Sequence, residues 1–155
     1  MVHLTHVGSD PDLAHCRELF REYADSLGSV FVAESDDNTF AKLPGEYAAP
    51  DGCLMLAYIE KMAVGCVALK KVRDNVCEMK RLYVRPPFRR EGIGRKLALK
   101  VIEHARAKEY KLMLLDTLPP MKEATSLYRS LRFKEIAPYR DNPVEGELFM
   151  ELILS

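Results

Sequence analysis

The sequence predicts a mixed α+β fold, layered α/β/α, in which one sheet carries helices on both faces. Apolar periodicity gives the order strand, helix, three strands, helix, strand, helix, two strands, which is typical of this class. Three strand patterns follow one another between Cys53 and Val84 with short turns, as in an antiparallel meander. The run Leu112–Leu115 is continuously apolar, which indicates a strand covered on both faces.

The first part of the chain predicts a short strand and a long helix. His3–Val7 alternates as a strand does, and Ser9–Asp12 is typical of a helix start. A cap oxygen, a first-turn proline and carboxylates near the positive end of the dipole occur together there. Gly28 is expected to end the helix. Residues 29–50 predict a short helix or an irregular loop, and Pro50–Gly52 predicts a turn.

The remaining elements follow from the same periodicities, with helical spacing after the glycines near residue 92 and alternation elsewhere. Lys71–Asn75 is expected to be a polar connection. The expected elements are strands at Cys53–Ile59, Ala63–Lys70 and Val76–Val84, a helix from about Gly92 to Lys108, a strand at Leu112–Leu115, a helix carrying Ala124, Leu127, Tyr128 and Leu131, and a strand pair at Phe133–Ala137 and Glu147–Leu154.

Length and composition narrow the class of protein. A chain of 155 residues fits one domain, expected over residues 1–155. Its 23 basic and 23 acidic residues cancel, which disfavours a nucleic-acid partner. No apolar run long enough for a membrane span and no secretory signal are expected. The four cysteines contain no C-x-x-C pair, so we expect reduced thiols in the core, a cytoplasmic location and no bound metal. The four histidines are scattered, and we assign them no functional role.

The chemistry centres on the stretch Glu78–Leu97, which predicts a strand, a basic loop and the start of a helix. Arg85, Arg89, Arg90 and Arg95 lie there with only Glu91 opposing them. A helix N-terminus leaves unpaired amides and a partial positive charge, and glycines let a ligand approach them. These features predict a phosphate or pyrophosphate site, and a solvated basic loop remains the alternative.

Two common nucleotide motifs do not fit this loop. A dinucleotide fingerprint needs glycine or alanine at its third conserved position, where Leu97 stands. A phosphate-binding loop of the Walker type needs Gly-Lys-Ser/Thr, which the loop lacks. The predicted phosphate site therefore belongs to neither class.

Three segments together resemble the GNAT superfamily of acyl-CoA-dependent N-acetyltransferases. Arg89–Gly94 matches the family signature R/Q-x-x-G-x-G/A, and Leu82–Val84 resembles the strand before it. Ala124–Phe133 is similar to the family segment A-x-x-L-Y-x-x-x-G-F. The resemblance covers residues 78–133 and implies acetyl-CoA as donor. It also implies a mostly antiparallel sheet whose central parallel strand pair splays apart.

The resemblance implies which residues bind the cofactor. The strand offers backbone groups to the pantetheine arm, and the loop offers amides to the pyrophosphate; an ordinary paired strand is the alternative. Arg90, Arg132 and Met121 depart from the family pattern, and positive φ at Arg132 would add strain of about 1–2 kcal/mol. The implied cofactor-binding residues are Leu82, Tyr83, Val84, Arg89, Arg90, Glu91, Gly92, Ile93, Gly94 and Arg95.

Two residues are candidates for proton transfer. The resemblance implies that Tyr128 lies beside the CoA sulfur as an acid, although it also sits on an apolar helical stripe where a tyrosine packs. It implies Glu78 as the base, with a solvent-facing carboxylate or a partner of Lys80 as the alternative. Tyr83, Asp116 and Tyr139 are weaker candidates.

The expected function is N-acetyl transfer from acetyl-CoA to a primary amine of a small molecule or peptide. Direct attack in a ternary complex is expected, because no cysteine lies in the motif to form an acyl-enzyme. Glu34, Asp36, Asp37 and Glu46 form either an acidic rim for a cationic amine or a solvated loop. A non-catalytic acyl-CoA sensor and an interaction protein with a basic surface loop are the alternatives, and a homodimer is suggested by family habit alone.

Overall fold

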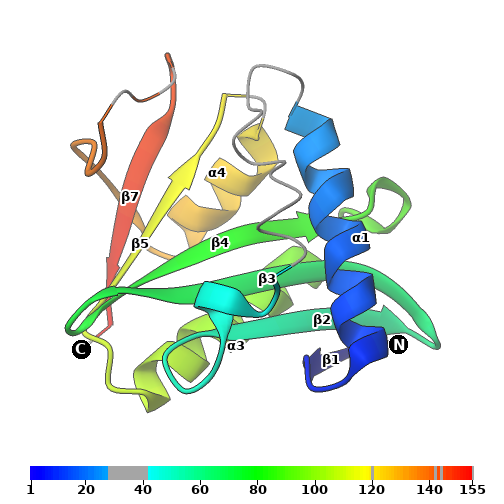
Figure 1. The fold of residues 1–155 in the computed structure, drawn as a ribbon. Coiled ribbons are helices and arrows are strands. Elements are labelled where there is room, and N and C mark those ends of the chain that lie inside the picture. The colour runs from blue at the N-terminus through cyan, green and yellow to red at the C-terminus, as the bar shows by residue number, and fades with distance from the viewer. Residues whose placement is uncertain (28–41, 120, 142, 144, 155) are drawn as a thin grey trace.

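A single seven-stranded sheet forms the centre of the molecule, with strand order β1-β2-β3-β4-β5-β7-β6. The structure is a computed structural model and describes residues 1–27, 42–119, 121–141, 143 and 145–154. Helix α1 covers one face of the sheet, and α3 and α4 lie on the other (Figure 1). The predicted fold class, with one mostly antiparallel sheet between helices, is confirmed.

Most expected elements occur within a residue or two of their predicted bounds. The observed elements are β1 (Val2–His6), α1 (Asp10–Leu27), η2 (Gly45–Tyr47), β2 (Cys53–Ile59), β3 (Met62–Arg73), β4 (Val76–Val84), η3 (Pro86–Phe88), α3 (Ile93–Ala107), β5 (Leu112–Thr117), α4 (Lys122–Ser130), β6 (Lys134–Ile136) and β7 (Leu148–Ile153). Among the described residues, no helix is both long and apolar enough to cross a membrane.

One predicted connection is wrong. Residues 71–73 were expected in the polar connection Lys71–Asn75, but β3 continues to Arg73 and pairs there with Val76. Their side chains are exposed, so no hydrophobic pattern marks them as a strand. Backbone hydrogen bonds to β4 set their extended conformation instead. Gly28 and most of the segment 29–50 lie outside the described residues, and the part described includes the short helix η2.

Two apolar clusters pack on opposite faces of the sheet. The larger lies under α3 and α4 and includes Leu97, Val101 and Met113; the smaller lies under α1 and includes Phe20 and Tyr47. Alternation along the strands supplies both, since successive side chains point to opposite faces. The sheet therefore holds the two halves of the core together.

A β-bulge in β4 changes which side chains face α1. Cys66 pairs with Tyr83 but Ala68 pairs with Lys80, so Val67 opposes two residues of β4. One of them, Arg81, has φ +58° and is buried among α1-side residues. An extra residue in one strand reverses the alternation beyond it. The bulge therefore places Tyr83 on the α1 face, where its ring lies 6.0 Å from that of Tyr23.

The parallel strands β4 and β5 separate partway along their length. Their ladder begins at Val76 with Leu112 and its last pair is Glu78 with Leu114. Beyond this point β5 continues to Thr117, paired on its other side with β7. The residues of β4 after Glu78 thus turn an unpaired edge toward the gap, which confirms the predicted splayed pair.

Candidate active site

A groove of about 980 Å³ lies where β4, the loop after it and three helices meet. The C-terminal half of β4 forms its floor, and the start of α3, the start of α4 and the end of α1 form its walls. Apolar and basic groups share the lining, as an acyl chain attached to a phosphorylated nucleotide requires. The lining includes Leu82, Tyr83, Val84, Arg89, Arg90, Gly92, Ile93, Gly94, Arg95, Met121, Ala124 and Leu127.

The groove includes nine of the ten residues predicted to bind a cofactor. Glu91 is exposed and is absent from the lining. Leu82–Val84 lies at the unpaired edge of β4, so backbone groups there are available to a ligand that lies along the strand. The predicted strand and loop thus belong to one continuous surface.

The loop turns sharply into α3 through two left-handed residues. Arg90 has φ +67°, and Gly92, the N-cap of α3, has φ +79°. A Cβ built on Gly92 meets nothing within 4 Å, so the groove is open beside it. The first turn of α3 exposes amides without partners inside the helix. This arrangement is a site for an anion at a helix N-terminus.

The arginines of the loop differ in the partners that their side chains contact. Arg89 donates from Nε to the Val84 carbonyl at 2.8 Å and lies over the Tyr83 ring. Arg95 donates to Ser130 at 3.0 Å, and Arg90 lies 3.4 Å from Glu123 in an exposed pair. Each of these contacts is to a neutral group or is screened by water. Arg89, Arg90 and Arg95 therefore retain positive charge toward the groove.

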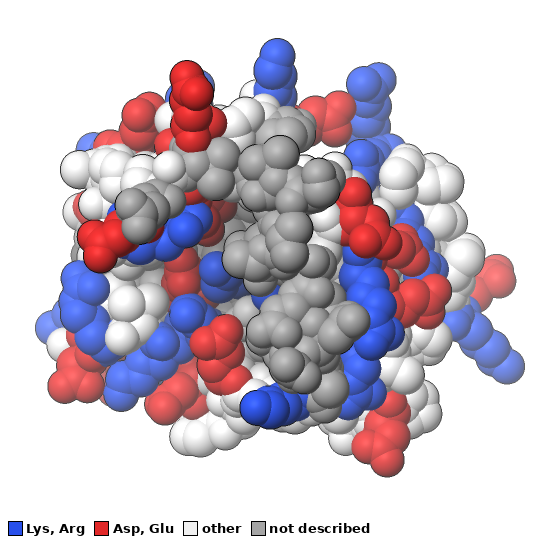
Figure 2. All heavy atoms as spheres, turned by 45° about the horizontal axis from the view of Figure 1, so that its top comes forward, with Lys and Arg blue, Asp and Glu red and all other residues white. Residues whose placement is uncertain are grey.

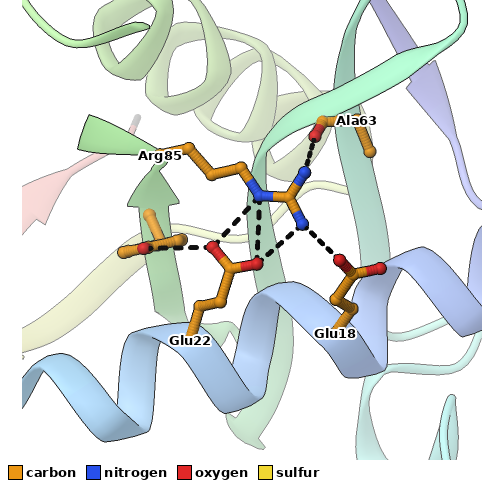
Figure 3. A network of polar contacts seen from close by, with 5 residues as sticks. Glu18, Glu22, Ala63 and Arg85 are labelled. Carbon is orange, nitrogen blue, oxygen red and sulfur yellow. Dashed lines mark hydrogen bonds and ion pairs between the residues drawn. The ribbon is translucent and has the colours of Figure 1, made fainter. Parts of the chain in front are cut away.

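Arg85 does not act with them, and the expectation that only Glu91 opposes the arginines is wrong. Its Nη2 lies 2.7 Å from both Glu18 and Glu22 of α1, and its Nη1 donates to the Ala63 carbonyl (Figure 3). Hydrogen bonding to Glu22 raises the pKa of Arg85. Arg85 therefore joins the end of β4 to α1. Its partner Glu22 lies 63 residues away in the sequence, so no local pattern indicated this pair.

The surface around this end of the molecule carries both signs of charge. On the face shown in Figure 2, basic and acidic side chains alternate and neither sign forms a continuous field. The sequence has the same balance, with 23 residues of each sign.

Glu78 lies at the point where β4 and β5 separate. Only 5% of the residue is exposed, so the predicted alternative of a solvent-facing carboxylate is wrong. The Tyr139 hydroxyl donates to its Oε2 at 2.6 Å, and the Lys70 ammonium lies 3.8 Å from Oε1. A buried carboxylate held by a tyrosine at a strand opening is suitably placed to accept a proton.

Tyr128 is packed in the core cluster under α3 and α4. It is 4% exposed, and its ring lies edge-on to Phe133 with centroids 5.8 Å apart. Burial, and then the charge of Asp116, raises the pKa of Tyr128. Its neighbours Ala124 and Leu127 line the groove whereas Tyr128 is not among the lining residues. Its packing is thus established, and its role as an acid stays a prediction.

A charged cluster beside Glu78 includes residues that sequence reasoning missed. Arg140 lies 2.9 Å from Asp116 and forms a short contact with buried Glu147. Burial, and then the charges of Glu78 and Asp116, raise the pKa of Tyr139. Asp116 directly follows the apolar run Leu112–Leu115, and a carboxylate at the end of a buried strand can be recognised in the sequence as a candidate site residue. Arg140 and Glu147 carry no such signal, because a loop brings them to Asp116.

Of the three departures from the family pattern, Arg90 and Arg132 stand at left-handed backbone positions and Met121 lines the groove. Arg132 has φ +77° at the end of α4, where the amide of Phe133 bonds to the Tyr128 carbonyl and that of Arg132 to the Arg129 carbonyl. This is a Schellman motif, in which glycine is usual. Arg90 is likewise left-handed, and Met121 lines the groove and accepts a contact from the Tyr23 hydroxyl at 3.6 Å.

The predicted acidic rim is only partly within the described residues. Glu34, Asp36 and Asp37 lie outside them. Glu46 is described, and its carboxylate lies 3.4 Å from Lys70 on an exposed surface. Lys70 thus contacts both Glu46 and the candidate base Glu78, which makes Glu46 a suitable comparison residue.

Comparison with known proteins gives consistent matches. The model of the acetyltransferase (GNAT) family matches residues 13–133. An uncharacterized N-acetyltransferase of Schizosaccharomyces pombe is 35% identical over 146 residues, which are 93% of this chain and 90% of that protein. An N-acetylaspartate synthetase of Xenopus tropicalis is 35% identical over 98 residues, 63% of this chain and 36% of that one. The PaiA N-acetyltransferase of Thermoplasma acidophilum, solved in complex with coenzyme A, has the same fold, with a TM-score of 0.78, 21% identity and 99% of each chain covered.

Proposed function

The chain belongs to the acetyltransferase (GNAT) family, and from this premise we propose that it moves an acetyl group from acetyl-CoA to a primary amine of a small molecule or peptide. The observation that carries the proposal is the coincidence of three features in one groove. These are the open edge of β4, the glycine loop and the N-terminus of α3. The edge of β4 matches the pantetheine arm of one cofactor, and the loop and helix N-terminus match its pyrophosphate.

The cofactor is proposed to lie along the groove with its pyrophosphate at the loop. Amides of Gly92–Gly94 and the charges of Arg89, Arg90 and Arg95 bind the phosphates, because a helix N-terminus and guanidinium groups both attract anions. The pantetheine arm pairs with the edge of β4 at Leu82–Val84 as an added strand. The thioester then lies near the point where β4 and β5 separate.

The reaction is proposed to be direct attack in a ternary complex. The neutral amine adds to the thioester carbonyl, the carbon–sulfur bond breaks, and acetyl passes to nitrogen without an acyl-enzyme. The amine loses one proton and the departing thiolate gains one. A β4 amide stabilises the negative charge that develops on the carbonyl oxygen. The four cysteines are free and buried, which supports a mechanism without a cysteine nucleophile and the proposed cytoplasmic location.

Glu78 is proposed as the base and Tyr128 as the acid. Glu78 is the last β4 residue paired with β5, and Tyr139 fixes one of its oxygens. The raised pKa of Tyr128 keeps its hydroxyl protonated at neutral pH, as an acid requires. Because that pKa lies well above that of a thiol, the hydroxyl stabilises the thiolate chiefly as a hydrogen-bond donor. Tyr139 is proposed as a positioning residue.

The test has two stages. Acetyl-CoA should raise the melting temperature of the protein, and a panel of amines should then release free CoA thiol in its presence. The panel includes aspartate, because a relative is named N-acetylaspartate synthetase, together with other amino acids, polyamines and short peptides. Binding without thiol release from any amine favours the non-catalytic sensor. Absence of binding rejects the cofactor site.

A further inference from the structure

A second cluster of reactive side chains lies at the other end of α3, outside the groove. It consists of His6 at the end of β1, Cys53 at the start of β2 and His104 in the last turn of α3. One potential ligand atom from each residue lies within 4.8 Å of the other two. The rings of His6 and His104 have centroids 5.2 Å apart. Three elements distant in sequence thus bring two imidazoles and a thiol together.

His104 supplies a second, independent observation. Its Nε2 is buried and has no hydrogen-bond partner in the described part of the chain. Among the described residues, it is the one buried side-chain nitrogen or oxygen atom without a partner. An unpaired buried polar atom costs free energy and is rare in native proteins. A ligand bound at Nε2 would remove this cost.

We propose that His6, Cys53 and His104 bind a divalent transition metal of the Zn²⁺ class. Two imidazole nitrogens and one thiolate are a borderline-soft donor set, which favours Zn²⁺, Co²⁺ and Ni²⁺ over Mg²⁺ or Ca²⁺. This site is separate from the cofactor groove, since His104 lies eleven residues after Ile93 on α3, or roughly 16 Å along the helix axis.

The geometry needs only a small local adjustment. Tetrahedral zinc, with bonds of about 2.0–2.1 Å to nitrogen and about 2.3 Å to sulfur, holds its ligands roughly 3.3–3.6 Å apart. The three atoms therefore need to close by at most about 1.5 Å, and rotation of the exposed His6 side chain contributes to this. Cys53 binds as the thiolate, and its proton passes to solvent. A cavity of about 490 Å³ beside all three residues gives solvent access and room for a water as fourth ligand.

The bound metal has a structural role. β1 is an edge strand that pairs with β2, and α3 packs across the same face as Cys53. A metal at the cluster cross-links β1, β2 and the last turn of α3. Anything that binds the native state and not the unfolded state stabilises the former by mass action. Metal binding should therefore raise the melting temperature without acting on the acetyl-transfer chemistry.

The experiment measures metal binding to the full chain after removal of any affinity tag and treatment with a chelator. Zn²⁺ is titrated against the protein in the presence of a phosphine reductant, with competition by a chromogenic chelator. The expected result is one equivalent bound per chain, a rise in melting temperature with Zn²⁺ but not with Mg²⁺, and a thiolate-to-metal charge-transfer band with Co²⁺. Failure of the wild-type chain to bind Zn²⁺ or Co²⁺ would overturn the proposal.

Variants locate the site. His6→Gln removes an exposed ligand and should fold, and Cys53→Ser removes the thiolate. Each should weaken Zn²⁺ binding at least tenfold, and Cys53→Ser should abolish the Co²⁺ charge-transfer band. His15→Gln is the matched control, because His15 lies against Tyr58 and outside the cluster. Zn²⁺ affinity retained in His6→Gln and Cys53→Ser, or lost equally in His15→Gln, would place the metal elsewhere and reject this site.

Discussion

Arg132 occupies a backbone conformation that favours glycine. Its φ of +77° closes the Schellman motif after α4, and Phe133 packs on Tyr128 across the same turn. A left-handed residue with a Cβ costs about 1–2 kcal/mol. The motif persists because the two backbone hydrogen bonds and the Phe133 contact require this conformation. Arg132 therefore carries strain that the end of the helix offsets.

Arg132→Gly should raise the free energy of unfolding by up to about 1 kcal/mol, because relief of strain exceeds the added entropy of glycine in the unfolded chain. Urea unfolding followed by circular dichroism gives the midpoint. Arg129→Gly is the comparison, since it places glycine inside α4 and should cost about 1 kcal/mol. Equal destabilisation by both changes would show that Arg132 is unstrained.

Tyr128→Phe removes one oxygen and keeps the ring that packs on Phe133, so the fold should persist. If the hydroxyl stabilises the departing thiolate, turnover should fall by about 10²-fold, the lower end of the usual range for acid–base catalysis. Thiol release is measured at saturating acetyl-CoA with an accepting amine. Tyr110→Phe, whose hydroxyl bonds to the Asp51 carbonyl outside the groove, is the control. A Tyr128→Phe rate within about twofold of the parent would assign Tyr128 to packing alone.

Glu78→Gln keeps the size of the side chain and removes its ability to accept a proton. Turnover should fall by about 10²–10⁴-fold, and Tyr139→Phe should give a smaller loss because Tyr139 only fixes the carboxylate. The acetyl-CoA melting shift should remain, since Glu78 does not line the groove. Glu46→Gln alters an exposed carboxylate that contacts the same Lys70 and should have little effect. Equal losses in Glu46→Gln and Glu78→Gln would remove Glu78 as the base.

At the scale of elements, the strand–loop–helix unit of β4, η3 and α3 forms the proposed cofactor site. The bulge at Arg81 turns Tyr83 to the α1 face, and Arg85 fixes the end of β4 to α1 through Glu18 and Glu22. These contacts hold the open edge of β4 in place on one side. The helix N-terminus of α3 then faces the groove from the other side. The proposed binding of acetyl-CoA requires that β4 and α3 keep this arrangement.

Gly94 tests the phosphate site within this unit. Its Cβ position lies 3.7 Å from Val84 Cγ2 and 3.8 Å from Leu127 Cδ2, which is ordinary contact, so a methyl group fits. Gly94→Ala should fold and retain much of the acetyl-CoA melting shift. Gly94→Glu places a carboxylate where the phosphates are proposed to bind and should abolish the shift while the apo protein stays folded. A full shift in folded Gly94→Glu would reject the phosphate site.

At the scale of the whole molecule, the two apolar clusters lie on opposite faces of the same sheet. β3 and β4 contribute residues to both, including Val67 and Met79 on one side and Cys66 and Tyr83 on the other. Neither cluster can lose its packing without exposing a face of these shared strands. The predicted single domain over residues 1–155 is therefore proposed to unfold as one unit. The homodimer suggested by resemblance to the family stays a prediction, which light scattering can test.

Urea unfolding should show one transition, because the sheet is common to both halves of the core. The chain has seven tyrosines and no tryptophan, so far-ultraviolet circular dichroism and tyrosine fluorescence are the two probes. Their midpoints should coincide. Saturation with acetyl-CoA at about 100 times its Kd should add about 2.7 kcal/mol to the free energy of unfolding. Separate midpoints for the two probes would contradict the single-domain prediction.

The sequence alone was sufficient for features that depend on neighbours in the chain. Strand alternation and helical spacing set most elements, and the loop Arg89–Gly94 showed its glycines and charges directly. The predicted splay of β4 from β5 is confirmed, although it rested on resemblance to a family and not on the residues themselves. Local backbone conformation and hydrophobic periodicity are short-range properties, which is why they can be read without the fold.

Only the tertiary structure decided which charges act together. Arg85 was counted with the loop arginines, but Glu22 of α1, 63 residues away, neutralises it. Glu78 is buried and held by Tyr139, 61 residues away, and His6, Cys53 and His104 meet from three separate elements. Such pairs are absent from any local pattern, because burial and the crossing of strands set the distance between side chains. Charge and ligand chemistry depend on that distance, so the sequence supplied the groups and the fold assigned their partners.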